Sequence, residues 1–187
     1  MKTAKNLLKK ATACGMVLIL FVMFLAAASP QRVYASDDDD DFTLSKYKVK
    51  VKHGYLALRS KKAFKRSNEI GKLYTGDRLI HCPTDSENST YWYVYSPKLN
   101  KLGYVNRNYL RYYKEYTGDI DYYVKVKKGY LALRNAKAYK RSNEIGKMYN
   151  YEDVIVLHKS RSTDYWTVYS PDLEKAGFTN KHYLREW

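Results

Sequence analysis

The sequence G-Y-L-A-L-R-S-K-K-A-F-K-R-S-N-E-I-G-K-L-Y at Gly54–Tyr74 occurs again as G-Y-L-A-L-R-N-A-K-A-Y-K-R-S-N-E-I-G-K-M-Y at Gly129–Tyr149. Only four of the 21 aligned positions differ. Such a copy within one chain is an internal duplication, and a duplicated sequence predicts a duplicated structural unit.

The two copies continue beyond this stretch. Tyr91–Leu110 corresponds to Tyr165–Leu184, and the offset between equivalent positions falls from 75 to 74 residues. One residue has therefore been lost between the matched segments. Because deletions are tolerated where the chain runs over the surface, we expect exposed turns at residues 83–90 and 159–164.

The N-terminal 35 residues have the pattern of a secretory signal peptide. Basic residues precede an uncharged apolar run at Gly15–Leu25, and Val33 and Ala35 supply small side chains around a cleavage site after Ala35. The alternative is a retained membrane anchor, because the apolar run continues to Ala28 and approaches the roughly 20 residues of a spanning helix. With cleavage, the protein is expected to be secreted and extracellular.

The sequence has a formal net charge of +15 and 21 tyrosines among 187 residues. Removing residues 1–35 takes away five of the 34 basic residues and no acidic one, which leaves 29 against 19, a charge of +10. The five acids of Asp37–Asp41 predict a solvated, disordered spacer over residues 36–45. Cys82 is then the remaining cysteine, so no intramolecular disulfide is expected.

From Tyr47 onward the apolar residues follow the period of a β-strand. Tyr47–Lys52 alternates apolar with basic residues, and Tyr123–Lys127 repeats this alternation. Tyr91–Tyr95 is rich in aromatic and β-branched residues and predicts another strand, while Asn106–Leu110 predicts a tight 3-10 turn. Five or six short strands in about 65 residues, without an amphipathic helix, indicate an all-β unit.

The duplication and the strand pattern divide the chain into segments. We expect a first domain at residues 46–113, a linker at 114–121 and a second domain at 122–187. Because the linker is short, the two domains are expected to touch along a modest interface.

Four motifs in this order resemble the bacterial SH3 (SH3b) domain family. They are Tyr55–Ser60, Ile70–Leu73 with Gly76-Asp77, Tyr91–Val94, and Gly103–Val105 followed by Asn108–Leu110. The second copy departs from the pattern, because Tyr151-Glu152 replaces Gly76-Asp77 and Thr179 replaces Val105.

The resemblance implies two tandem small SH3-like β-barrels that cover nearly all of the mature chain. Members of this family are binding modules, usually secreted, that often accompany cell-wall hydrolases and target them to peptidoglycan. The two domains fill the mature chain here, so a non-catalytic protein that binds peptidoglycan or teichoic acid is expected. The alternative is a peptide- or protein-binding scaffold for another exported protein.

The residues expected to bind the ligand are aromatic and basic. By the resemblance, aromatic residues of both copies line a ligand groove and basic residues border it; they are Tyr91, Tyr104, Tyr109, Lys65 and Arg66 in the first copy, and Tyr165, Phe178, Tyr183, Lys140 and Arg141 in the second. Tyrosine suits contact with sugar rings or peptide backbones. The alternatives are tyrosines that pack across strands and a basic loop that is only solvated.

Catalytic and cofactor-dependent functions are not expected. His81 and Cys82 are strand neighbours that point to opposite faces, so they do not form a nucleophile and base pair. The histidines lack the paired spacings of a zinc site, and no cofactor is predicted. Basic and aromatic residues together also fit single-stranded nucleic acid, but secretion argues against that partner.

Overall fold

The computed structural model describes residues 44–85, 87, 90–116 and 122–187. The predicted signal peptide and almost all of the acidic spacer lie outside these residues, as does the linker from residue 117 onward. All of these described residues belong to one compact unit. Within the described ranges every helix is a single 3-10 turn, and the protein is all-β, as predicted.

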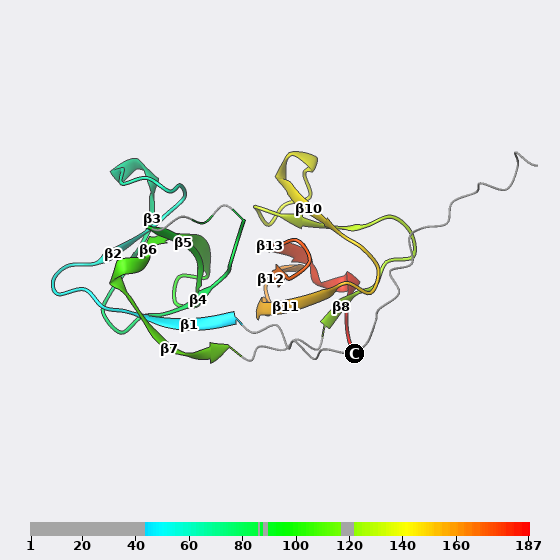
Figure 1. Cartoon of the computed structure of the whole chain (residues 1–187). Helices are drawn as coiled ribbons and strands as arrows, with labels where there is room; N and C mark the ends of the chain where they lie inside the picture. Colours follow the sequence, from blue (N-terminus) through cyan, green and yellow to red (C-terminus); the bar gives the residue numbers. More distant parts are fainter. Residues whose placement is uncertain (1–43, 86, 88–89, 117–121) are drawn as a thin grey trace, which may run out of the picture. The chain divides into compact units, whose positions relative to one another are not determined.

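The first copy forms a seven-stranded antiparallel sheet (Figure 1). Its strands pair in the order β3-β2-β6-β5-β4-β1-β7. They are β1 (Leu44–Val49), β2 (Leu56–Arg59), β3 (Glu69–Leu73), β4 (Arg78–His81), β5 (Tyr91–Ser96), β6 (Lys101–Asn106) and β7 (Leu110–Tyr116).

The second copy forms an equivalent sheet in the order β10-β9-β13-β12-β11-β8-β14. Its strands are β8 (Tyr122–Val124), β9 (Leu131–Arg134), β10 (Glu144–Met148), β11 (Asp153–His158), β12 (Tyr165–Ser170), β13 (Lys175–Asn180) and β14 (Leu184–Glu186). Each strand of one sheet has its counterpart at the same place in the other. The duplicated sequence is therefore a duplicated sheet, and we call the two copies the first and second repeats.

The last strand of each repeat was not predicted from the sequence, and the structure differs from the predicted boundaries of the spacer and the linker. Leu44 and Ser45, assigned to the acidic spacer, belong to β1, where they pair with Tyr116 and Glu115. Residues 114–116, assigned to the linker, belong to β7. The reason is that pairing with β1 orders β7, whose residues after Leu110 are all exposed or only half-buried.

One local prediction concerns a 3-10 turn. The turn predicted over residues 106–110 is present as Arg107–Tyr109, and the Asn106 side chain caps it by accepting a hydrogen bond from the Asn108 backbone N–H at 3.0 Å. A second 3-10 turn, at Arg66–Asn68, follows the irregular basic segment that begins at Lys61.

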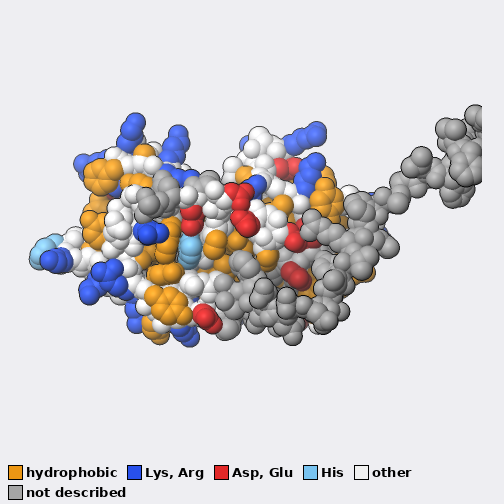
Figure 2. Space-filling view, viewed as in Figure 1, with side chains coloured by type: hydrophobic (Ala, Val, Ile, Leu, Met, Phe, Trp, Pro, Cys, Tyr) orange, Lys and Arg blue, Asp and Glu red, His pale blue; other side chains and the backbone are white. Residues whose placement is uncertain are grey.

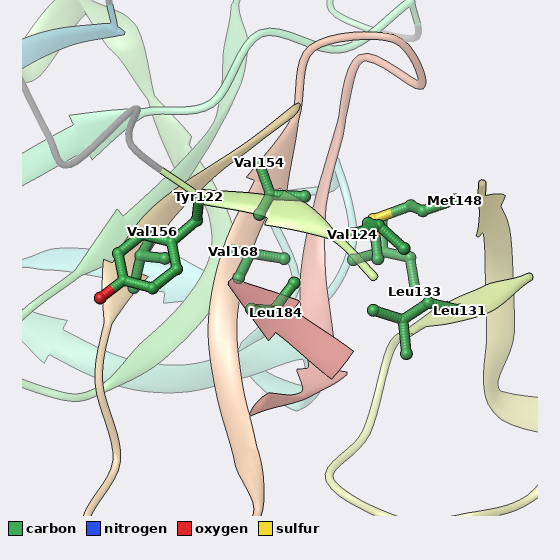
Figure 3. Packing of buried hydrophobic residues seen from close by; sticks show 9 residues of the cluster. All are labelled: Tyr122, Val124, Leu131, Leu133, Met148, Val154, Val156, Val168 and Leu184. Carbon is green, nitrogen blue, oxygen red and sulfur yellow. The ribbon is translucent and has the colours of Figure 1, made fainter. Parts of the chain in front are cut away.

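Each repeat has its own hydrophobic core. In the first repeat all seven strands contribute to one buried cluster: Val49, Leu56, Leu58, Leu73, Leu79, Val94, Val105 and Leu110. Figure 3 shows the equivalent cluster of the second repeat, in which side chains such as Val168, Met148 and Leu184 come from different strands. The buried cluster of each repeat therefore takes apolar side chains from both edge strands of its sheet.

A third buried cluster takes residues from both repeats, and we call it the inter-repeat cluster. Its members are Leu44, Ile80, Cys82 and Tyr95 from the first repeat and Ile155, Leu157, Tyr169 and Ala176 from the second. Tyr93, Leu102 and Tyr116 pack against it. The two repeats are thus in contact, as the short linker predicted.

Thr167 and Thr179 are both fully buried in the second repeat, but only one has a partner. The Thr179 hydroxyl donates to the Ala132 carbonyl at 3.1 Å, whereas the Thr167 hydroxyl has no hydrogen-bond partner among the described residues. Burying an unsatisfied polar group is costly. We expect Thr167→Val to raise the free energy of unfolding by about 1 kcal/mol in urea titrations, and Thr179→Val to lower it by about as much. A loss of stability in Thr167→Val would contradict the view that the Thr167 hydroxyl is buried without a hydrogen-bond partner.

Candidate functional site

An open groove lies on the first repeat, and we call it the first groove. It has a volume of about 920 Å³. Its walls combine aromatic rings with cationic side chains. They come from β2 and the segments on either side of β2, from the start of β5, and from β7 and the turn before it. The aromatic lining residues are Tyr55, Phe64, Tyr91 and Tyr109, and the cationic ones are Lys50, Lys52, Arg59 and Arg111. Figure 2 shows Lys and Arg side chains gathered around hydrophobic side chains on this repeat.

Arg59 organises one wall of the first groove. Its side chain is almost fully buried, and its Nη2 lies 3.4 Å from Oε1 of Glu69. Its Nη1 donates to the backbone carbonyl of Lys65 at 2.7 Å, and the Tyr55 hydroxyl donates to Oε2 of Glu69 at 3.1 Å. The guanidinium therefore holds strand β2, strand β3 and the segment before Arg66 together.

Phe64 is the most exposed large apolar side chain of the first repeat. It is 87% exposed, and its ring centroid lies 4.8 Å from Cζ of Arg59. Stacking on a guanidinium is favourable for an aromatic ring and fixes its orientation. An exposed aromatic ring held in place at a groove wall is a surface available for ligand contact.

The second repeat has an equivalent groove of about 1010 Å³, which we call the second groove. Arg134 lies 3.3 Å from Glu144 and donates to the Lys140 carbonyl at 2.6 Å. The Tyr130 hydroxyl donates to Glu144 at 3.0 Å, and Tyr139, which is 89% exposed, stacks on Arg134 at 4.8 Å. The same network is therefore built twice.

Both grooves are electropositive by composition. The first has four Lys and Arg residues in its lining, and Glu69 is the one carboxylate among its described lining residues. In the second groove Lys128 replaces His53, which gives five cationic residues against Glu144. Each glutamate is already paired with a buried arginine. The remaining cations therefore give each groove lining a net positive charge, which attracts an anionic ligand.

Four of the ten predicted ligand residues line the grooves. Tyr91 and Tyr109 line the first, and Tyr165 and Tyr183 line the second.

The other six predicted residues are not among the described groove linings. Tyr104 packs against Tyr93 with ring centroids 4.9 Å apart, and Phe178 lies 5.2 Å from the ammonium of Lys137. The remaining four, Lys65, Arg66, Lys140 and Arg141, are exposed around the 3-10 turns, and two of them contribute backbone carbonyls to the arginine networks.

The structure also brings in residues that were not selected from the sequence. Tyr55 and Arg59 lie in the first half of the duplicated stretch. Strand alternation places them on the face that does not carry Leu56 and Leu58, so this pattern could have identified them as groove residues. Phe64 offered no comparable signal, because it lies in an irregular segment and is placed by the hydrogen bond between Arg59 and Lys65.

Cys82 and His81 are separated as predicted. The thiol is fully buried in the inter-repeat cluster, and burial raises the pKa of Cys82 above its ordinary value. The His81 ring stacks on Trp92 with centroids 4.3 Å apart, and its Nε2 lies 2.8 Å from Glu87. A raised thiol pKa disfavours the reactive thiolate.

Among the residues whose positions are described, no group of three or more His, Cys, Asp or Glu side chains comes together to hold a metal ion. Likewise, none of their helices has the length and apolar character needed to span a membrane.

Comparisons with known proteins give no family for this chain. No family model and no curated protein matches it. Among solved structures, NlpC2 and NlpC1 from Trichomonas vaginalis are similar at 10% identity, with TM-scores of 0.30 and 0.29. The alignments cover 78% and 80% of this chain but 49% and 48% of those chains, so this chain spans about half their length. Similarity at this level carries no argument about function.

Proposed function

We propose that the protein is a secreted, non-catalytic binding protein whose two SH3-like barrels hold a bacterial cell-wall polymer in their grooves. The observation that carries this proposal is the recurrence of one groove in both repeats, with aromatic rings at equivalent positions and an excess of cations in each. Aromatic rings suit sugar and peptide ligands, and the cations favour an anionic wall glycopolymer such as teichoic acid.

The barrel assignment is supported by the way each sheet encloses its core. In the first repeat the pairing runs from β3 at one edge to β7 at the other, yet Leu73 of β3 and Leu110 of β7 belong to the same buried cluster. A flat sheet cannot bring its two edges into one core. The four motifs that resemble the SH3b family fall on β2, β3, β5 and β6 with the turn that follows.

A non-catalytic role is supported by the state of the side chains that could react. Cys82 is buried between the repeats, and no cysteine or serine is among the described residues that line either groove. Most of the polar side chains there are phenols, ammonium groups and guanidinium groups, and each groove's glutamate is paired with an arginine. These groups supply contact area and charge, which serve binding.

The test uses exposed aromatic residues that contribute little to stability. In Phe64→Ala/Tyr139→Ala the retention on purified cell-wall sacculi should fall by roughly tenfold. The reason is that the contact of a ligand's sugar ring with an aromatic side chain is worth about 1–2 kcal/mol. The thermal unfolding midpoint should be unchanged, since both rings are almost fully exposed. Trp187→Ala is the matched control, because Trp187 is also exposed, at 70%, but lies outside both groove linings.

The sacculi are used with and without wall teichoic acid. Retention that disappears with the teichoic acid supports the anionic polymer as ligand, and retention that persists supports peptidoglycan. Because the grooves are cationic, retention on teichoic acid should also weaken as salt is raised from 50 mM toward 1 M. No retention of the wild-type protein on either preparation would contradict wall binding and favour a protein partner.

A further inference from the structure

The inter-repeat cluster is built from equivalent residues of the two repeats. Four residue pairs occupy the same positions in their sheets: Ile80 and Ile155, Cys82 and Leu157, Tyr95 and Tyr169, and Leu102 and Ala176. Each repeat therefore offers the other the same face, made by β4, β5 and β6 in one and by β11, β12 and β13 in the other.

Contacts across this cluster are also reciprocal. The ring of Tyr95 lies 6.4 Å from the ring of His158, and the hydroxyl of Tyr169 donates to the carbonyl of Pro83 at 3.1 Å. Tyr95 is equivalent to Tyr169, and Pro83 to His158. Self-complementary contact of this kind defines an approximate two-fold axis, as in a homodimer, here within one chain.

The inter-repeat contact leaves both grooves open. No described member of the inter-repeat cluster lines either groove, and the groove residues Tyr55 and Tyr130 stay at least 36% exposed. The repeats are joined through a buried apolar face on one side, while each keeps its cationic groove available. Binding at one groove therefore does not require the repeats to separate.

We infer that this two-fold packing makes the protein a bivalent receptor for a linear polyanion in which the same anionic unit recurs along the chain. The inference rests on the proposed function for the chemistry of each groove. Two grooves with matching linings select the same unit, and their fixed connection makes the second binding event intramolecular. A polymer long enough to reach both grooves then binds far more tightly than a fragment that fills one.

Single-groove variants of the full-length protein test this inference. Phe64→Ala weakens the first groove alone and Tyr139→Ala the second, and both are titrated with glycerol-phosphate oligomers of increasing length. On short oligomers each variant should lose about twofold in apparent affinity, because one of two independent sites remains. On long polymers each should lose about tenfold or more, since the second attachment is lost.

Two outcomes separate this inference from the proposed function. If short and long oligomers both bind and the single variants lose only twofold on each, bivalency is wrong while groove binding stands. If no oligomer binds at all, the inference fails, and retention on sacculi freed of teichoic acid then decides whether the proposed function stands. Oligogalacturonate of matched charge and length distinguishes recognition of phosphate from recognition of carboxylate, and equal avidity for both would assign the effect to charge spacing.

The contact itself is tested through the buried thiol. In a Cys14→Ser background Cys82 is the sole cysteine of the full-length protein. Tyr169→Phe removes one hydrogen bond across the repeats, the one to the Pro83 carbonyl, and should speed labelling of Cys82 about fivefold. Tyr95→Phe is the matched control, because its lost hydrogen bond is to Asn100 within one repeat. Equal acceleration in both variants would overturn the assignment of Cys82 to a specific inter-repeat contact.

Discussion

Gly103→Ala should lower the free energy of unfolding by about 3 kcal/mol, at the upper end of the usual cost of overpacking a core. A Cβ atom at Gly103 would lie 2.7 Å from the backbone carbonyl oxygen of Arg59 and 3.0 Å from Cγ of Leu58. Backbone cannot move aside as a side-chain tip can. The two strands concerned, β6 and β2, would have to separate at the wall of the first groove.

Gly71→Ala provides the matched control for that variant. A Cβ atom there meets Cδ1 of Leu99, the end of a flexible side chain that can rotate away. Its cost in urea unfolding followed by tryptophan fluorescence should be about 1 kcal/mol. Gly177→Ala, which places a Cβ atom 2.7 Å from the Arg134 carbonyl, should repeat the larger loss in the second repeat. Equal losses in Gly103→Ala and Gly71→Ala would show that close backbone approach does not set the cost.

Arg59→Met should lower the free energy of unfolding by about 2–3 kcal/mol, because it leaves the partly buried Glu69 without its cation. The change also removes the hydrogen bond to the Lys65 carbonyl, which positions the segment that carries Phe64. We therefore expect the variant to lose affinity for wall polymer as well as stability.

A double-mutant cycle distinguishes the ion pair from simple loss of packing. In Arg59→Met/Glu69→Gln the unpaired carboxylate is gone, so at least half of the lost stability should return. Arg134 and Glu144 allow the same cycle in the second repeat. If the second substitution only adds to the damage, Glu69 does not depend on Arg59 and the network at the groove wall is misassigned.

The sequence predicted the all-β class and the duplication because both depend on local patterns. Alternation along Tyr47–Lys52 and the apolar density of Tyr91–Tyr95 report burial that repeats every second residue. It could not predict β7, whose burial pattern follows no regular alternation and whose order depends on pairing with β1. Pairing between the two ends of a repeat is a long-range property.

The candidate site was predicted in part, for a related reason. Tyr91 and Tyr109 line the first groove as expected, whereas Tyr95 faces away from the core of the first repeat but is buried in the inter-repeat cluster. Strand alternation gives the face on which a side chain lies. It does not say whether water or another repeat covers that face. Phe64 depends on a hydrogen bond made by a residue five positions earlier, which no periodicity reports.

The central claim is that the two equivalent grooves are where the wall polymer binds. The most direct measurement is amide chemical-shift mapping of the isotope-labelled protein titrated with a short teichoic acid fragment. We predict that the largest shifts surround Tyr55, Phe64 and Tyr109 in the first repeat and Tyr130, Tyr139 and Tyr183 in the second. Shifts confined to other surfaces would contradict the account. So would an unchanged spectrum when the same protein is retained on sacculi that carry teichoic acid.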